Sequence, residues 1–189
     1  MQNLRKVVII GPESTGKSSL CKLLAEHYNT EWCPEFARDY LLYHGKNYSY
    51  DDLETIAKGQ IELEEKVALI VQGAPQNLAD NQTAKKLLFV DTDMYVMKVW
   101  CEFVFGKCHP KILNHIVARK YDAYLLCKPD LPWVKDELRE YPDLVTRETL
   151  YHHYKDLLIN QSRPWVEVIG KDAERLNSTI QWVDQLITK

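Results

Sequence analysis

Two patterns of apolar residues alternate along the chain. Short, nearly continuous apolar runs are typical of buried parallel strands, and they occupy residues 6–10, 30–33, 87–90, 122–127 and 165–169. Segments with apolar residues every three or four positions are typical of helices, and they occupy residues 17–28, 35–42, 53–72, 94–105, 110–119, 149–161 and 172–187. Strands that alternate with helices predict an α/β fold around a parallel sheet.

Polar residues mark the ends of the long helix before the third strand. Asp51 or Asp52 is expected to cap its N-terminus, and Gly73 is expected to end it. Residues 74–86 contain proline, asparagine and aspartate, and they predict a polar connection to the next strand.

Composition limits the class of protein. The 189 residues, 46% hydrophobic and 27% charged, fit one globular domain spanning 1–189. A net charge of −3 gives no reason to expect a nucleic-acid partner, and no apolar run reaches the ~20 residues that span a bilayer. Without a signal peptide before the first strand, and with an odd number of cysteines, we expect a cytoplasmic protein with reduced thiols. The sequence does not determine the oligomeric state, and a homo-oligomer is one possibility.

The stretch from Gly11 to Ser18 reads G-x-x-x-x-G-K-S and directly follows the first predicted strand. In such a phosphate loop, backbone N–H groups and the N-terminus of the next helix hold the phosphates of a nucleotide. Lys17 would reach the β- and γ-phosphates, and the Ser18 hydroxyl would bind Mg²⁺. The predicted nucleotide-binding residues are Gly11, Glu13, Ser14, Thr15, Gly16, Lys17, Ser18 and Ser19.

Acidic residues stand at the ends of the next two predicted strands. Glu35 follows the second strand and shares a helical face with Arg38, as in an ordinary surface ion pair. However, ligands bind at the carboxyl ends of strands in open α/β sheets, which favours a place for Glu35 beside the phosphate loop. Asp91 ends the third strand, where it would serve Mg²⁺. Asp93 begins the following helix, where it would act as an N-cap, a role compatible with ligand contact.

The segment after the fourth strand predicts a loop over the site. Residues 129–148 begin with two prolines and Trp133 and continue with many charged residues, Arg139 and Arg147 among them. A solvated connection would explain this composition, but a lid that excludes water from a transferring phosphate fits it better. Arginines of such a lid would stabilise charge on the phosphoryl group.

Five motifs, taken in order, resemble a known family. They are GPESTGKS at 11–18, PEFARDY at 34–40, FVDTD at 89–93, GKCHP at 106–110 and DLPWVKDELR at 130–139. Over nearly its whole length the chain resembles the ribosylnicotinamide (nicotinamide riboside) kinase domain of bacterial bifunctional NAD-salvage proteins, which are P-loop kinases. The resemblance implies a three-layer fold with helices on both faces of a five-stranded parallel sheet, in the order 2-3-1-4-5.

The resemblance also implies a reaction. It is the transfer of the γ-phosphoryl group of ATP to the ribose 5′-hydroxyl of nicotinamide riboside, with Mg²⁺ at Ser18 and Asp91. Lys17 and Arg139 would act on the phosphates, and either Glu35 or Asp93 would activate the hydroxyl, as carboxylates do in phosphoryl transfer. The residues expected to border the nucleoside are Glu35, Phe36, Arg38, Tyr40, Asp93, Tyr95 and Trp133, since aromatic faces hold the cationic nicotinamide ring.

The chain departs from these relatives at its start. The first predicted strand begins almost at Met1, so we expect neither the adenylyltransferase domain nor the DNA-binding segment that precedes the kinase in them. Another nucleoside is therefore a second possible substrate of the kinase. Two other classes remain as well: a nucleotide-hydrolysing regulatory switch, and a module that senses ATP or NAD precursors without turnover.

Overall fold

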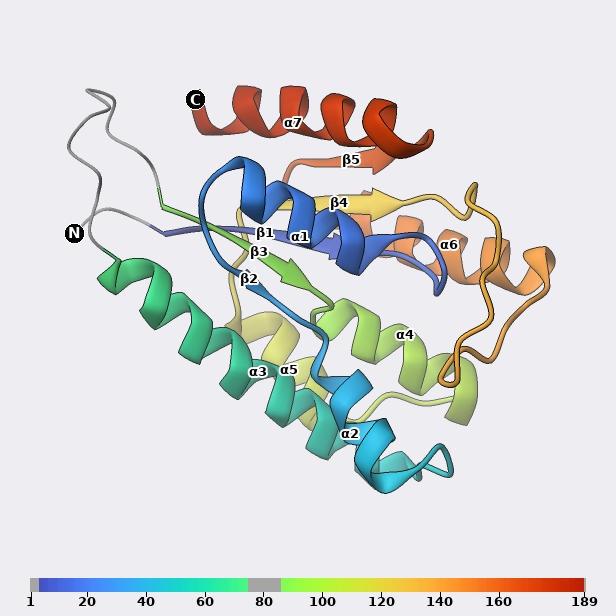
Figure 1. Ribbon diagram of the computed structural model, residues 1–189. Coiled ribbons are helices and arrows are strands. Elements are labelled where there is room, and N and C mark those ends of the chain that lie inside the picture. Colours follow the sequence, from blue (N-terminus) through green and yellow to red (C-terminus); the bar gives the residue numbers. More distant parts are fainter. Residues whose placement is uncertain (1–3, 75–85, 189) are drawn as a thin grey trace.

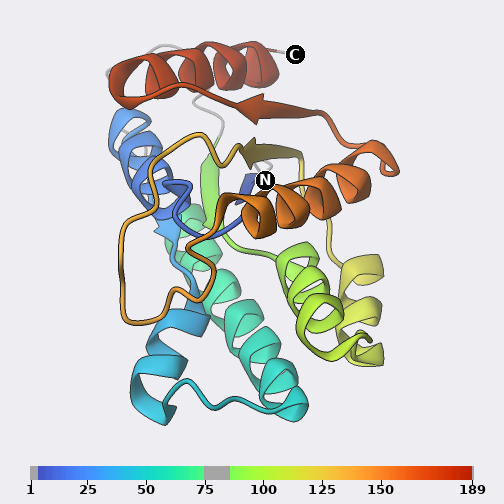
Figure 2. The same cartoon turned by 90° about the vertical axis from the view of Figure 1, so that its right-hand side faces the viewer.

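A computed structural model describes residues 4–74 and 86–188 of the protein, arranged as a sheet between two layers of helices (Figures 1 and 2). The sheet order is β2-β3-β1-β4-β5, and every neighbouring pair is parallel. This confirms the α/β class and the order 2-3-1-4-5. The strands are β1 (Arg5–Ile10), β2 (Trp32–Cys33), β3 (Leu87–Asp91), β4 (Ala123–Cys127) and β5 (Trp165–Val168).

Helices cover both faces of the sheet, as expected. Alternate residues of a strand point to opposite faces, so Val7 and Ile9 pack on one side of β1 and Val8 and Ile10 on the other. The first side is covered by α1 (Lys17–His27) and α7 (Asp172–Thr188), and the second by α3 (Tyr50–Gly73), α4 (Met94–Phe105) and α6 (Leu144–Ile159). None of the described helices is both long enough and apolar enough to cross a membrane.

A third apolar cluster lies beyond the β2 edge of the sheet. It joins α2 (Phe36–His44) and α5 (Pro110–Ala118) to α3 and α4 through residues such as Leu53, Met97 and Ile112. In Figure 1 this group lies below the sheet, with α2 and the start of α4 near the carboxyl ends of the strands. It supplies the second wall of the cavity described below.

Two helix starts differ from the prediction. The N-cap of α3 is Ser49, whose hydroxyl accepts from the Asp52 N–H while the Asp52 carboxylate accepts from the Ser49 N–H. Asp52 is therefore the partner in a capping box, and neither it nor Asp51 is the cap. Helix α6 begins at Leu144, five residues before the predicted start at 149, because Asp143 caps it by accepting from Thr146 N at 2.7 Å. The predicted connection 74–86 lies almost entirely outside the described residues.

Candidate active site

The phosphate loop lies between β1 and α1, which is the strand–loop–helix context that the motif requires. Gly11 adopts φ +142°, and a Cβ there would lie 2.6 Å from the carbonyl oxygen of Cys127 on β4. Only glycine lets the loop pass this close to the neighbouring strand. Gly16, at φ +76°, is the N-cap of α1. The Nζ of Lys17 donates to Pro12 O at 2.9 Å, which places the ammonium group over the loop.

Arg175 of α7 supports the loop from behind. The side chain is buried, and it donates to Thr15 O at 2.8 Å and to the Asp130 carboxylate at 2.9 Å. It thereby joins the phosphate loop to the segment that leaves β4. The sequence analysis missed this residue, since a single arginine on an amphipathic helix gives no signal of a contact so far along the chain.

Ser18 and Asp91 form a small oxygen-rich site at the end of β3. The Ser18 hydroxyl donates to Asp91 Oδ2 at 2.5 Å, while Asp91 Oδ1 is buried without a hydrogen-bond partner among the described residues. Burial, and then the nearby charge of Glu35, raise the pKa of Asp91 to about 7. A buried carboxylate oxygen without a partner is costly, and a divalent cation would satisfy it. Hydroxyl and carboxylate oxygens, completed by phosphates and water, fit Mg²⁺.

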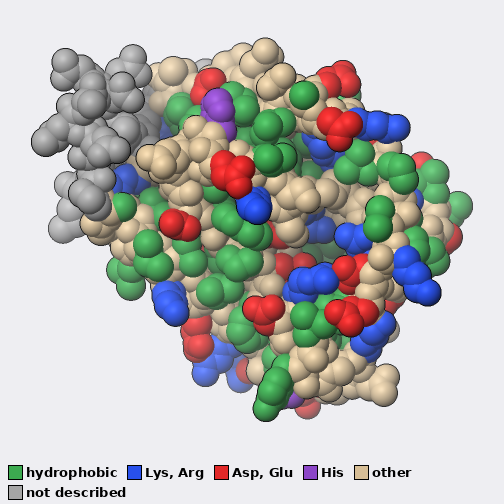
Figure 3. All heavy atoms as spheres, in the orientation of Figure 1, with side chains coloured by type: hydrophobic (Ala, Val, Ile, Leu, Met, Phe, Trp, Pro, Cys, Tyr) green, Lys and Arg blue, Asp and Glu red, His purple; other side chains and the backbone are tan. Residues whose placement is uncertain are grey.

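A cavity of about 360 Å³ opens in front of the phosphate loop. Figure 3 shows a hollow on this face with acidic and basic side chains gathered around it. Of the predicted residues, all of 11–19 together with Glu35, Arg38, Asp91 and Arg139 line the cavity. The structure therefore brings the predicted phosphate-binding residues, the two carboxylates at strand ends and two arginines to one place.

Asp93 has a different position from Glu35. It is 2% exposed, caps α4 by accepting from Tyr95 N at 2.9 Å, and accepts from the Tyr124 hydroxyl at 3.2 Å. Burial raises its pKa to about 7. The predicted cap is confirmed, but Asp93 is not among the residues that line the cavity. Glu35 lines the cavity at the N-cap of α2, and its side chain makes no capping hydrogen bond there, so it is the better placed of the two carboxylates to meet a ligand.

The four aromatic residues expected beside the nucleoside do not line the cavity. Phe36 packs against Gly59 of α3, where a Cβ would lie 2.2 Å from its ring. Tyr40 donates its hydroxyl to Asp52 at 2.6 Å. The Tyr95 ring packs at a tilt against the Tyr124 ring, and the Trp133 indole N–H donates to Glu13.

Other aromatic residues line the cavity instead. Trp100 and Phe103 of α4 line the cavity, and the loop residues Tyr48 and Tyr141 lie on it as well. Trp100 donates its indole N–H to the Tyr48 hydroxyl at 2.9 Å, which fixes the orientation of both rings. The sequence analysis chose Tyr95 on this helix and missed Trp100 and Phe103, because the many apolar residues of α4 do not reveal which of them face a ligand.

Residues 128–143, between β4 and α6, contain no helix or strand and run along the open side of the phosphate loop toward α2 (Figure 2). The Glu13 carboxylate holds this segment through three donors: the Trp133 indole at 3.0 Å and the N–H groups of Glu140 and Tyr141 at 2.9 and 2.8 Å. The carboxylate of this predicted nucleotide-binding residue is therefore turned toward the segment.

Further contacts fasten the same segment. Ser14 Oγ accepts from Val134 N at 3.0 Å. Arg38 forms a bidentate ion pair with the Asp136 carboxylate, at 3.2 and 2.9 Å. Arg147, predicted as a lid arginine, is 4% exposed within α6 and donates to a backbone oxygen of the segment. Arg147 belongs to the buried face of α6 and not to the predicted lid, because α6 begins earlier than predicted.

Comparison with known proteins agrees with this geometry. The AAA domain family AAA_28 matches residues 6–175. The chain belongs to this family. Among curated proteins, this AAA domain is similar to the trifunctional NAD biosynthesis/regulator protein NadR of Escherichia coli (strain K12), with 29% identity over 175 residues. The match covers 90% of this chain and 40% of that protein, so the chain spans less than half of its curated relative.

Solved structures show the same fold. A crystal structure of NadR protein in complex with NR matches 96% of this chain and 49% of that chain, with a TM-score of 0.74 and 19% identity. A second NadR structure, in complex with NAD and AMP-PNP, matches 98% of this chain and 50% of that chain, with a TM-score of 0.70 and 18% identity. The expected P-loop kinase fold is thereby confirmed for this AAA domain.

Proposed function

We propose that the protein is an ATP-dependent kinase that phosphorylates the ribose 5′-hydroxyl of nicotinamide riboside, giving nicotinamide mononucleotide in cytoplasmic NAD salvage. The observation that carries the proposal is the cavity lined jointly by the phosphate loop, Asp91 and Glu35. Such a cavity holds a phosphoryl donor and an acceptor side by side. The similarity to NadR, of which one structure contains NR and another AMP-PNP, supports both ligands.

The phosphate loop and its neighbours would bind Mg-ATP. Backbone N–H groups of the loop and the N-terminus of α1 would hold the phosphates, with Lys17 over the β- and γ-phosphates. Ser18 and Asp91 would hold Mg²⁺, which supplies positive charge against the phosphate oxygens when bound. Asp91 Oδ1, buried without a partner among the described residues, would then be satisfied.

Glu35 would accept the proton of the attacking hydroxyl. It lines the cavity together with Lys17 and Asp91, at the N-cap of α2. Together with burial, the nearby Glu35 helps to raise the pKa of Asp91, which supports a place for both carboxylates in one site. Arg139, also on the cavity wall, would stabilise charge on the transferring phosphoryl group. Residues 129–148 would act as a lid of one kinase domain. The part of the lid that would move ends before α6, which begins at Leu144.

The acceptor end of the cavity suits a cationic ring. The aromatic residues Trp100, Phe103 and Tyr48 line the cavity, and the acidic residues Asp39 and Glu140 line it too. Aromatic faces and carboxylates both attract a pyridinium cation. A neutral nucleoside would gain only the aromatic stacking, which favours nicotinamide riboside among nucleosides.

The test is turnover with a panel of nucleosides. The purified protein with Mg-ATP is incubated with nicotinamide riboside or another nucleoside, and ADP and 5′-monophosphate are measured together. We expect equal amounts of ADP and nicotinamide mononucleotide, abolished in Lys17→Ala. The control Lys22→Ala removes a solvent-exposed lysine of the same helix and is expected to keep activity.

Other outcomes would point elsewhere. Phosphorylation of a different nucleoside would keep the mechanism and replace the substrate. ADP release that does not depend on any nucleoside would contradict the kinase proposal and favour a nucleotide-hydrolysing switch.

A further inference from the structure

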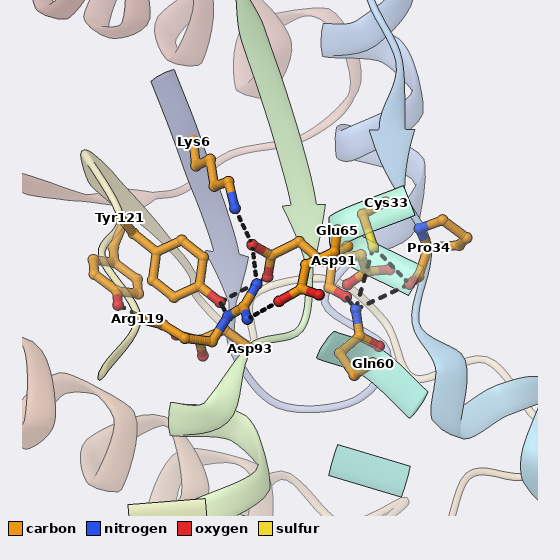
Figure 4. A network of polar contacts seen from close by, with 11 residues as sticks. Lys6, Cys33, Pro34, Gln60, Glu65, Asp91, Asp93, Arg119 and Tyr121 are labelled. Carbon is orange, nitrogen blue, oxygen red and sulfur yellow. Dashed lines mark hydrogen bonds and ion pairs between the residues drawn. The ribbon is translucent and has the colours of Figure 1, made fainter. Parts of the chain in front are cut away.

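Gln60 lies within α3 and is 1% exposed, and its side chain reaches between the ends of β2 and β3 (Figure 4). Its Oε1 accepts from Phe36 N at 2.7 Å, and its Nε2 donates to Pro34 O at 3.2 Å. The same nitrogen lies 3.5 Å from Asp91 O and 3.4 Å from the Cys33 sulfur. One buried carboxamide therefore contacts both strand ends that carry the site's carboxylates.

The partners of Gln60 surround Glu35 on both sides. Pro34 and Phe36 are the residues before and after it, so Gln60 fixes the main chain on each side of the Glu35 Cα. The Glu35 side chain itself makes no capping hydrogen bond, so its place depends on that main chain. Asp91 lies close enough for its pKa to respond to Glu35, and two carboxylates repel each other when both are ionised, so the main chain must hold them in place.

We propose that Gln60 is a positioning residue that fixes Glu35, the proton acceptor, relative to Asp91, the Mg²⁺ ligand. The inference rests on the kinase function proposed above. A carboxamide suits this task because it donates and accepts at once. An ionised glutamate at this position would accept from Phe36 N but would not donate to Pro34 O, and methionine would do neither.

The packing of α2 on α3 does not depend on Gln60 alone. The Phe36 ring lies against Gly59, and Leu53, Ile56 and Ala37 belong to the same apolar cluster. We therefore expect Gln60→Met, which conserves volume, to fold. An error of about 1 Å in the placement of a catalytic group costs about 100-fold in rate.

The experiment compares Gln60→Met and Gln60→Glu with the wild type under saturating Mg-ATP and nicotinamide riboside. Gln161 supplies the matched controls, because its carboxamide accepts from Arg163 N at 2.6 Å and donates to Arg163 O at 2.8 Å in the turn before β5. We expect Gln60→Met to lower kcat about 100-fold while KM for ATP changes less than about threefold. Gln161→Met should change neither constant.

Gln60→Glu provides a second readout. The introduced carboxyl group, when protonated, donates to Pro34 O while it accepts from Phe36 N, so the kcat of this variant relative to the wild type should rise as pH falls from 8 to 6. The titratable groups near this position are Cys33 of β2, Asp91 of β3, Glu35 at the start of α2 and Glu64 of α3 itself. They are present in every protein compared, and Gln60→Met, which adds no titratable group at position 60, is the control whose ratio should stay flat.

Each outcome decides the matter. A Gln60→Met enzyme within threefold of the wild-type kcat would overturn the inference, and so would equal losses in kcat and in ATP affinity. If Gln60→Met does not fold, a pH-independent ratio for Gln60→Glu overturns it. A wild-type protein without turnover on any nucleoside would contradict the proposed function instead, so the two failures are distinguishable.

Discussion

The hydrogen bonds of Glu13 predict how firmly the segment 128–143, the proposed lid, is held against the phosphate loop. The change is Glu13→Ala, which removes the acceptor of three hydrogen bonds, from Trp133 and from the N–H groups of Glu140 and Tyr141. A hydrogen bond contributes about 1 kcal/mol net, and water replaces part of this at the exposed Glu140 N–H. The loss is thus about 2 kcal/mol, which corresponds to a roughly 30-fold increase in the population in which this segment is detached.

Hydrogen–deuterium exchange measures this directly, because two of the donors are the backbone amides of Glu140 and Tyr141. We expect these amides to exchange about 30-fold faster in Glu13→Ala, since exchange follows local opening. Glu137→Ala removes an exposed carboxylate from the same segment and serves as the control. Unchanged exchange at Glu140 and Tyr141 in a folded Glu13→Ala protein would refute the reasoning that Glu13 holds this segment.

Three more predictions concern the carboxylates. Glu35→Gln should lower kcat by at least about 100-fold, whereas Asp93→Asn, which conserves a good N-cap, should stay within about tenfold; the reverse order in the turnover assay would exchange their roles. The pKa of Asp93 in the folded state, about 7, lies above its unfolded value of about 3.9. Between these values the folded state keeps a proton that the unfolded state loses. The free energy of unfolding therefore falls as pH rises from 4 to 7, by about 4 kcal/mol at most. The free energy of unfolding of Asp93→Asn relative to the wild type, from urea denaturation, should therefore rise between pH 5 and pH 8, and a constant difference would contradict this. Asp91→Asn should weaken calorimetric binding of Mg-ATP much more than of ATP in EDTA, and equal losses would argue against a metal at Asp91.

Local patterns predicted the parts of the site that local sequence encodes. The phosphate loop and Asp91 lie at strand ends, and both follow apolar runs that are legible in the sequence. The capping box of Ser49 and Asp52 has a spacing that can be recognised in the sequence, but it was not predicted, because the adjacent aspartates are themselves good N-caps. The early start of α6 was missed because Arg147 is charged yet buried, so it interrupts the apolar period from which the helix was predicted.

Contacts between distant residues could not be predicted in the same way. Glu13 and Trp133 lie 120 positions apart, and nothing beside either residue indicates a hydrogen bond between them. Likewise, α4 is apolar around most of its circumference, so its sequence does not show that Trp100 faces the cavity. A long-range partner and the orientation of an all-apolar helix both depend on tertiary packing, which single-sequence patterns do not contain.

The link between Thr15 and Arg175 affects how the protein matures on the ribosome. The two residues are separated by 160 positions, so the contact that supports the phosphate loop is absent until α7 has left the exit tunnel. Domains fold during synthesis as their elements emerge, and here the sheet around β1 gains its C-terminal helix last. A nascent chain would thus present its phosphate loop without this support from behind until α7 has been translated.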